Sequence, residues 1–566
     1  MPADPSNDTA NTAAAPRAGA PEVTDRSGSG TEWWRGAVIY QIYPRSFFDT
    51  TGNGVGDLPG IWQKLDYVAD LGVDGIWISP FFTSPMKDFG YDIADFTGVD
   101  PLFGTLADFD AIITKAHALG LKVIIDQVYS HSSDQHPWFQ ESRASRTNAK
   151  ADWYVWADPK PDGTPPNNWL SVFNGPAWTW DTRRRQYFFH NFLPEQPDLN
   201  LHNPDVVDAI EATARFWLDR GVDGFRLDAA NFYLHDPALP NNPASGVRDA
   251  VRPRAFQQHI YNRSQPEGLA VIERLRRVLD AYPDRFSVGE IGEQNDHQEV
   301  IAYTKGPNRL HTAYNFAFIE ADHVSARLIR AALAVWQPVA GEAWPAWTFS
   351  NHDRPRVVTR WDGEGDPAFA KLMAALLFSL RGTLFLYQGE ELGLPQGDIP
   401  YERLTDPEAI ANWPETIGRD GCRTPMPWQA NAPQAGFSTG DPWLPVDPRH
   451  PPLAVDAQTA DPSSTLAFVR QFLTRRRDVP ALIRGDVRLY ETAEPLLVFE
   501  RRLADDRLLC VFNLGRSSEN RPLPDAAAGP WQRLDGFGLT GLIEDGWVTL
   551  GPLTGLIARQ PVSRPA

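Results

Sequence analysis

The feature that most constrains this chain is a series of eight short apolar runs, most of them followed by a stretch with helical periodicity. Parallel strands that are covered on both faces have this near-continuous apolar character. Strand–helix alternation repeated eight times predicts an α/β fold with a closed (β/α)8 barrel, known as a TIM barrel. Right-handed crossovers and the count of eight favour closure of the sheet. The runs cover residues 37–43, 73–79, 121–128, 222–228, 286–291, 311–318, 346–351 and 382–388.

The uneven spacing of the runs predicts further domains around the barrel. Residues 129–205, between the third and fourth runs, are rich in Trp, Pro, Asn and Asp and are expected to form an excursion domain on the catalytic face. The barrel itself is then expected to comprise residues 33–128 and 206–476. After residue 477, short strands with turn signals and no evident helix predict a C-terminal antiparallel β domain over 477–566.

Composition narrows the classes of partner and compartment. Among the 566 residues, acidic side chains exceed basic ones by 19, which argues against nucleic acid and anionic membrane surfaces as partners. Residues 1–32 are expected to be a disordered tail, because they lack the basic and apolar segments of a secretory signal. Cys422 and Cys510 form neither a disulfide framework nor a metal motif. A cytoplasmic location is therefore predicted.

Three carboxylates stand at or just beyond the carboxyl ends of predicted strands: Asp228, Glu290 and Asp353. Active sites of barrel enzymes are built at that edge. Arg226 lies two residues before Asp228 and so shares its strand face, where its charge is expected to lower the pKa of Asp228, as a nucleophile requires. Glu290 closes an apolar strand, which is expected to raise its pKa and suit a general acid.

One nucleophilic carboxylate and one protonated carboxylic acid form the pair that a retaining glycosidase uses. His131 and His352 are predicted to hydrogen-bond sugar hydroxyls at two other strand ends. No thiol, flavin or nucleotide chemistry is indicated, so no organic cofactor is expected. The high content of Trp and Phe agrees with a carbohydrate-active protein, because aromatic faces stack on sugar rings, although core packing explains most single Trp residues.

The ordered motifs of the chain resemble those of the α-amylase superfamily, glycoside hydrolase family 13, and in particular its α-glucosidase and oligo-1,6-glucosidase branch. The resemblance implies that Asp228 is the nucleophile, Glu290 the acid/base and Asp353 the stabiliser of the transition state. It also implies the barrel, the excursion domain and the C-terminal β domain. The motifs are DQVYSH (126–131), QPDLN (196–200), GFRLDAAN (224–231), VGEI (288–291), SNHD (350–353) and RTPMPW (423–428).

The same resemblance implies a set of residues that line the sugar subsite at the cleavage point. They are Asp88, Tyr91, His131, Phe173, Phe192, Arg226, His352 and Arg423, with Arg419 as an equal alternative to Arg423. Ala229, directly after the nucleophile, resembles enzymes that prefer α-1,4 bonds. Arg354 departs from the family pattern, which leaves acceptor preference and transglucosylation open.

A glycine-rich loop after the first strand is a candidate site for a structural Ca²⁺ or Mg²⁺ ion. Its oxygen donors are spaced as in an EF-hand-like loop, although the final bidentate Glu is missing. A simple turn is the alternative. The candidate ligands are Asp49, Thr51, Asn53, Val55 through its carbonyl group, and Asp57.

Together these features predict a retaining, exo-acting α-glucosidase that cleaves short α-glucosides through a covalent glucosyl-enzyme, with transglucosylation. The alternatives are a glucosyltransferase, a sucrose hydrolase, or a sucrose- or trehalose-type isomerase on the same scaffold. A non-enzymatic binding protein is disfavoured, because all three acids are present. The expected partners are small α-glucosides, with no nucleic acid and no membrane, and the expected assembly is a monomer or homodimer.

Overall fold

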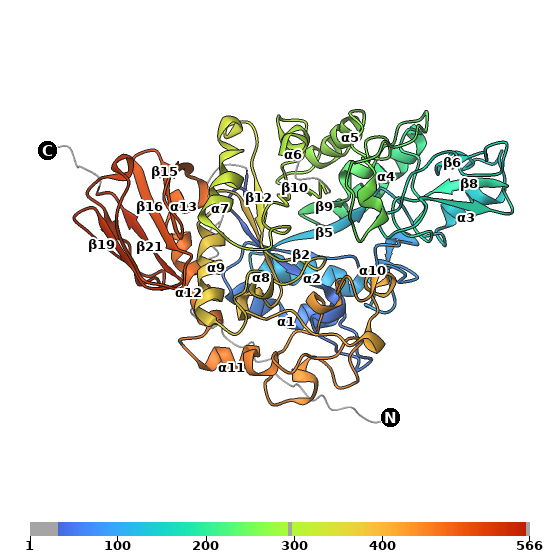
Figure 1. Cartoon of the computed structure of the whole chain (residues 1–566). Coiled ribbons are helices and arrows are strands. Elements are labelled where there is room, and N and C mark those ends of the chain that lie inside the picture. Colours follow the sequence, from blue (N-terminus) through green and yellow to red (C-terminus); the bar gives the residue numbers. More distant parts are fainter. Residues whose placement is uncertain (1–31, 293–296, 562–566) are drawn as a thin grey trace, which may run out of the picture.

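The computed structural model describes residues 32–292 and 297–561 and contains an eight-stranded parallel sheet. The strands follow the order β11-β10-β9-β5-β2-β1-β13-β12, and a parallel bridge from Tyr314 to Ala346 joins the two outer strands. The predicted (β/α)8 barrel is thereby confirmed (Figure 1). The strands are β1 (Val38–Ile42), β2 (Gly75–Ile78), β5 (Lys122–Val128), β9 (Gly224–Asp228), β10 (Phe286–Gly289), β11 (Thr312–Ala313), β12 (Ala346–Thr348) and β13 (Thr383–Tyr387).

A helix follows each barrel strand and covers the outside of the sheet. The first begins at its N-cap Asp57, whose carboxylate accepts from the N–H of Gly60, and the second begins with a capping box at Thr105. Chain reversal after these helices uses Gly72 and Gly120, both with positive φ. The helices are α1 (Leu58–Asp70), α2 (Leu106–Ala118), α4 (Pro204–Asp219), α5 (Gly268–Asp280), α6 (His297–Thr304), α7 (Ala326–Ala334), α8 (Val357–Arg360), α9 (Pro367–Ser379) and α12 (Thr465–Arg477).

Alternate strand residues fill the barrel interior, as the two-residue period of a strand requires. Ile39, Trp77, Ile124, Phe286 and Phe385 form part of one buried cluster inside the barrel. A larger cluster lies between the sheet and its surrounding helices. Because the interior is packed with side chains, the open space for a ligand lies at the carboxyl ends of the strands.

Three inserted segments surround that end of the barrel. The excursion after β5 carries α3 (Pro137–Ala144) and a three-stranded antiparallel sheet of β6 (Trp156–Ala157), β8 (Gln186–Phe189) and β7 (Trp178–Asp181). A second insert follows β9. A third follows β13 and contains α10 (Pro407–Asn412) and α11 (Val455–Ala460). A short hairpin of β3 (Phe82–Thr83) and β4 (Asp95–Val99) follows β2.

The C-terminal domain lies on the side of the barrel opposite the excursion (Figure 1). Its strands are antiparallel, as predicted, and they form one sheet of five strands and one of three. The prediction that no helix follows residue 477 is wrong, because α13 (Pro480–Arg484) buries Ala481 and Leu482 before the first strand. The strands are β14 (Asp486–Tyr490), β15 (Leu496–Leu503), β16 (Asp506–Asn513), β17 (Glu519–Pro522), β18 (Gln532–Arg533), β19 (Leu542–Glu544), β20 (Trp547–Leu550) and β21 (Thr554–Arg559).

Other sequence predictions concern the chain ends, the cysteines and the membrane. The tail predicted over residues 1–32 lies outside the described residues except for Glu32. Cys422 and Cys510 are free and buried. None of the helices within 32–292 and 297–561 combines the length and the apolar character needed to span a bilayer.

Candidate active site

The three predicted carboxylates meet in one pocket at the carboxyl ends of the strands. Asp228 is the last residue of β9, Glu290 directly follows β10, and Asp353 lies in the loop after β12. All three line a cavity that encloses about 960 Å³ of empty space, including its open mouth. The strand ends therefore deliver them to a common surface, as their spacing in the sequence predicted.

Arg226 links two of these acids at the floor of the pocket. Its Nη1 donates to Asp228 Oδ1 at 2.5 Å, and its Nη2 donates to Glu290 Oε2 at 2.6 Å. The same Nη1 also donates to Asp126 Oδ1 at 2.7 Å. The Arg226 side chain is only 2% exposed, so these are buried, charge-assisted hydrogen bonds. One guanidinium thus holds three carboxyl groups.

The net effect of this environment on Asp228 differs from the sequence prediction. Burial raises the pKa of Asp228 well above its usual range, and the negative charges of Glu290 and Asp126 act in the same direction. Arg226 lowers this pKa, as expected. Because three acids share its charge, it does not offset the increase caused by burial and by the two neighbouring acids. The prediction of a lowered pKa for Asp228 is therefore wrong for the ligand-free pocket.

The carboxyl group of Glu290 is oriented by two donors that converge on one oxygen. Oε2 accepts from Arg226 and, at 3.1 Å, from the backbone N–H of Ala229. Ala229 has a left-handed conformation, with φ 42° and ψ 45°, which turns its N–H toward Glu290. Because Oε2 receives both hydrogen bonds, a proton on Glu290 belongs on Oε1.

Two arginines and a histidine surround Asp353. Arg423 Nη2 donates to Asp353 Oδ1 at 2.8 Å, Arg419 Nη1 lies 3.5 Å from the same oxygen, and His352 Nε2 lies 3.2 Å from Oδ2. Burial alone would raise the pKa of Asp353, but the contact with His352 and the positive charges of Arg423 and Arg419 hold it well below its usual range. Asp353 is consequently an anion at neutral pH, whereas burial and neighbouring negative charges raise the pKa of Asp228. Both arginines proposed as alternatives contact this residue.

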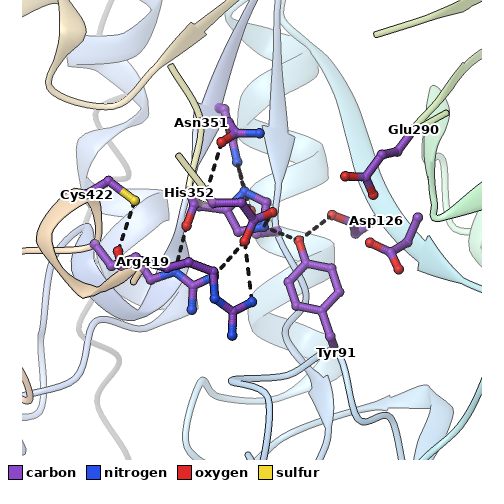
Figure 2. A network of polar contacts seen from close by, with 12 residues as sticks. Tyr91, Asp126, Glu290, Asn351, His352, Arg419 and Cys422 are labelled. Atoms are coloured by element: carbon purple, nitrogen blue, oxygen red, sulfur yellow. Dashed lines mark hydrogen bonds and ion pairs between the residues drawn. The ribbon is translucent and has the colours of Figure 1, made fainter. Parts of the chain in front are cut away.

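Both predicted histidines are buried and neutral at physiological pH. Burial lowers the pKa of His131 to about 3 and that of His352 to about 3. His352 Nδ1 lies 2.8 Å from Gln41 Nε2, and its Nε2 lies 2.5 Å from the hydroxyl of Tyr91. Figure 2 shows Tyr91 between His352 and Asp126.

The residues predicted to line the sugar subsite fall into two groups. Five of them line the cavity: Asp88, Tyr91, His131, Phe173 and Phe192. The other three, Arg226, His352 and Arg423, are almost fully buried behind the cavity wall, so their direct contact with a sugar stays a prediction. Their polar groups contact the catalytic carboxylates and hold them in place. Arg419 lines the cavity and binds Asp88 at 2.8 Å.

A chain of buried amides joins the excursion to the second insert at one wall of the pocket. Asn262 Nδ2 donates to Asn191 Oδ1 at 2.9 Å, and Asn242 Nδ2 donates to Asn262 Oδ1 at 2.9 Å. Asn191 in turn donates to Asp198 through its backbone N–H and its side chain. We call Asn191, Asn242, Asn262 and Asp198 the amide chain. It holds the segment that carries Phe192, which lines the cavity.

Sequence reasoning missed several residues of the site. Asp126 belongs to the predicted strand 121–128, and its signal was present: it stands in the DQVYSH motif at the same level as Arg226, with which it is paired in register. Phe232, Arg252 and Glu408 also line the cavity, and Arg252 forms an ion pair with Glu408. Arg252 and Glu408 come from separate inserts, the latter from the six-residue helix α10, and no periodicity in the sequence marked either residue.

The predicted metal loop is closed by its own hydrogen bonds. Asp49 accepts from the N–H of Gly54 at 2.7 Å and from the Ser438 hydroxyl at 2.5 Å, while Asp57 caps α1. In the part of the chain that the structure describes, no three His, Cys, Asp or Glu side chains gather as a metal site. The donors are all oxygen and fit Ca²⁺ or Mg²⁺ in chemical type, with only two carboxylates. A structural cation there stays a prediction.

Comparison with known proteins places the chain in a family. The model of the α-amylase catalytic domain matches residues 41–485, most of the chain. The chain belongs to the α-amylase family, glycoside hydrolase family 13. It falls in the α-glucosidase branch and is a glycoside hydrolase.

Individual relatives agree with this placement. A probable α-glucosidase of Rhizobium meliloti (strain 1021) is 52% identical over 538 residues, which cover 93% of this chain and 97% of the relative. The crystal structure of an α-glucosyl transfer enzyme, XgtA, has a TM-score of 0.91 at 52% identity and covers 94% of this chain and 100% of its own. A trehalulose synthase structure, MutB, has a TM-score of 0.84 at 32% identity. The match covers 93% of this chain and 100% of the MutB chain.

Proposed function

We propose that the protein is a retaining, exo-acting α-glucosidase that prefers α-1,4 bonds in short glucosides and also transfers glucosyl units. The observation that carries the proposal is the placement of Asp228 and Glu290 on the two terminal nitrogens of Arg226, both facing the same cavity. One guanidinium sets the two carboxyl groups side by side, as attack and protonation on one glycosidic bond require.

In the first half of the reaction, Glu290 gives the proton on Oε1 to the glycosidic oxygen while Asp228 attacks the anomeric carbon. The bond to the leaving group breaks, and an ester forms between Asp228 and the glucosyl unit. In the second half, Glu290 takes a proton from water or from an acceptor hydroxyl, whose oxygen then displaces Asp228. The anionic Asp353 stabilises positive charge that develops on the sugar ring in both transition states.

Two features favour a short substrate that is cleaved from its end. Asp88 and Arg419 bind each other at one side of the cavity, and Arg252 and Glu408 pair at another. Inserts therefore restrict the site on several sides, which suits a pocket for a terminal glucose better than an open cleft for a polysaccharide. Ala229 after the nucleophile supports the α-1,4 preference by resemblance.

The experiment is a panel of maltose, isomaltose, sucrose, trehalose and starch, with the products followed by proton NMR. We expect fast glucose release from maltose, slow release from starch, and α-glucose as the first anomer to appear. β-Glucose as the first anomer would contradict retention. Equal rates on maltose and isomaltose would contradict the linkage preference.

A glucosyltransferase or sucrose isomerase is the second candidate, supported by the likeness to the transfer enzyme and to the trehalulose synthase. In this case a sugar hydroxyl replaces water in the second half of the reaction. Isomeric disaccharides from sucrose, with little free glucose, would favour it over the hydrolase. A cytoplasmic location and a monomeric or homodimeric state stay predictions.

A further inference from the structure

We infer that Asp126 is a positioning residue that keeps a proton on the catalytic carboxyl pair, Asp228 and Glu290. It does so because its negative charge neutralises the positive charge of Arg226, which the pair would otherwise have to itself. The inference rests on the proposed function, because it concerns the same reaction. Asp126 does not line the cavity and has 0% exposure, so it acts on the reaction only through its neighbours.

Asp126 is held by donors on both of its oxygens. Oδ1 accepts from Arg226 Nη1 at 2.7 Å, while Oδ2 accepts from Trp77 Nε1 at 3.2 Å and from the Tyr91 hydroxyl at 3.2 Å. Trp77 is fixed in the packed interior of the barrel, and Tyr91 lines the pocket above it. Three side chains, those of Arg226, Trp77 and Tyr91, thus fix the position of the Asp126 carboxyl group.

The hydrogen bonds around Tyr91 determine to which neighbour its hydroxyl group donates. Gln41 Nε2 can only donate, so His352 Nδ1 accepts and the hydrogen of this neutral ring is on Nε2. His352 Nε2–H then donates to the Tyr91 oxygen, and the Tyr91 hydroxyl donates to Asp126 (Figure 2). Three donors therefore face Asp126, an arrangement that fits the carboxylate form.

The charge balance at the pocket floor follows from this form. Arg226 carries one positive charge and is shared by Asp126, Asp228 and Glu290, which would carry three negative charges if all were ionised. Two uncompensated charges in a largely buried cluster are costly, so the cluster retains a proton near neutral pH. Because Asp126 is the member with three donors, that proton resides on the pair that faces the substrate.

No other titratable group named around Asp126 supplies a negative charge in its place. Burial raises its pKa to about 6, Arg226 lowers it and Glu290 raises it, so Asp126 is predominantly ionised at pH 7. Tyr91 and Tyr314, which also face the cluster, have pKa values raised far above neutrality by burial, and His352 is neutral. Asp126 is therefore the negative charge that balances Arg226 from outside the catalytic pair.

The test is the Asp126→Asn variant, which keeps the shape of the side chain and removes its charge. Arg226 then acts on the catalytic carboxyl pair alone, and the pair gives up its retained proton at a lower pH, because a negative charge that raises the pKa of Asp228 is gone. We expect both limbs of the pH profile of kcat/KM on p-nitrophenyl α-glucoside to move to lower pH by about one unit. A profile that is lower in height but has unmoved limbs would overturn the inference, because it would show a structural role alone.

Asp223→Asn is the matched control. Asp223 is a buried acid that directly precedes β9, at the opposite end of that strand, where it pairs with His117 and Lys122. Its loss should lower the melting temperature and leave both limbs of the pH profile in place. If Asp126→Asn does not fold, Tyr91→Phe removes one donor to Asp126 and makes it a weaker acid, which should move the limbs in the same direction by less.

An infrared titration of the ligand-free enzyme separates this inference from the proposed function. The band of protonated carboxyl groups in the wild type should lose intensity at a higher pH than in Asp126→Asn. This readout needs no turnover, so it decides the inference even if no α-glucoside is cleaved. Identical titrations in both proteins would overturn it, whereas a wild type that is inactive on the whole substrate panel would overturn the proposed function alone.

Discussion

The floor of the pocket holds its side chains by charge, whereas one of its walls is held by neutral amides. At the floor, Arg226 binds three carboxyl groups at 2.5–2.7 Å. At the wall, the amide chain links two segments far apart in sequence, and burial raises the pKa of its Asp198 to about 8, so this acid is also largely neutral at pH 7. Charges at the floor set the protonation that the reaction needs, while amides at the wall fix shape without altering those charges.

The difference between floor and wall predicts two kinds of defect in variants. Loss of a charge at the floor should change the rate of bond breaking with little effect on which acceptor is used. Loss of an amide at the wall should change the choice between water and a sugar acceptor with a smaller effect on bond breaking.

The largest effect is expected for Asp228→Asn. The amide has no anionic oxygen to attack the anomeric carbon, so kcat on maltose and on p-nitrophenyl α-glucoside should fall by about 10⁴-fold or more. Initial rates on both substrates measure this fall in kcat, and circular dichroism verifies that the variant is folded. Turnover within ten-fold of the wild type would remove Asp228 from the role of nucleophile.

Glu290→Gln should separate the two carboxyl roles. Maltose has a poor leaving group and needs the proton, so its kcat should fall by about 10³-fold. p-Nitrophenyl α-glucoside needs much less protonation, so its first bond-breaking step should be slowed far less. Added azide should then yield α-glucosyl azide from the trapped ester. Equal losses on both substrates, with no azide product, would contradict the acid/base role.

Asn262→Ala tests the wall. It leaves Asn191 Oδ1 and Asn242 Nδ2 without their partner, which should destabilise the fold by about 2 kcal/mol. We expect the ratio of transfer to hydrolysis products from concentrated maltose to change several-fold, with the rate of bond cleavage reduced less. Asn168→Ala is the control, because Asn168 is exposed and contacts the backbone of Asn242 rather than its amide group: it donates to the carbonyl and accepts from the N–H. An unchanged ratio would restrict the amide chain to stability.

The smallest effect is expected from removal of divalent ions. The loop from Asp49 to Asp57 is closed by its own hydrogen bonds, and none of its residues lines the cavity that holds the acids. Treatment with EDTA should therefore lower the melting temperature by only about 1 °C, an amount that corresponds to about 1 kcal/mol in a protein of this size. Complete loss of activity on chelation, restored by Ca²⁺ or Mg²⁺, would show that this loop controls the floor.

Much of the floor could be predicted because strands impose a fixed geometry. Asp228 and Arg226 share a face since they are two residues apart, and Glu290 follows its strand directly. The partition of the proton among the acids could not be predicted, because it depends on Asp126. This residue is a hundred positions before Arg226 and meets it only through the pairing of β5 with β9.

The sequence by itself determined the eight-fold alternation of strands and helices, the order of the catalytic motifs and the edge of the sheet at which they meet. These features follow from local periodicity, which acts over a few residues. Tertiary structure alone decided that one arginine serves three acids, that His352 and Arg423 lie behind the wall, and that the amide chain joins the inserts. Such contacts depend on how irregular loops pack against each other, and no repeating pattern in the chain encodes that packing.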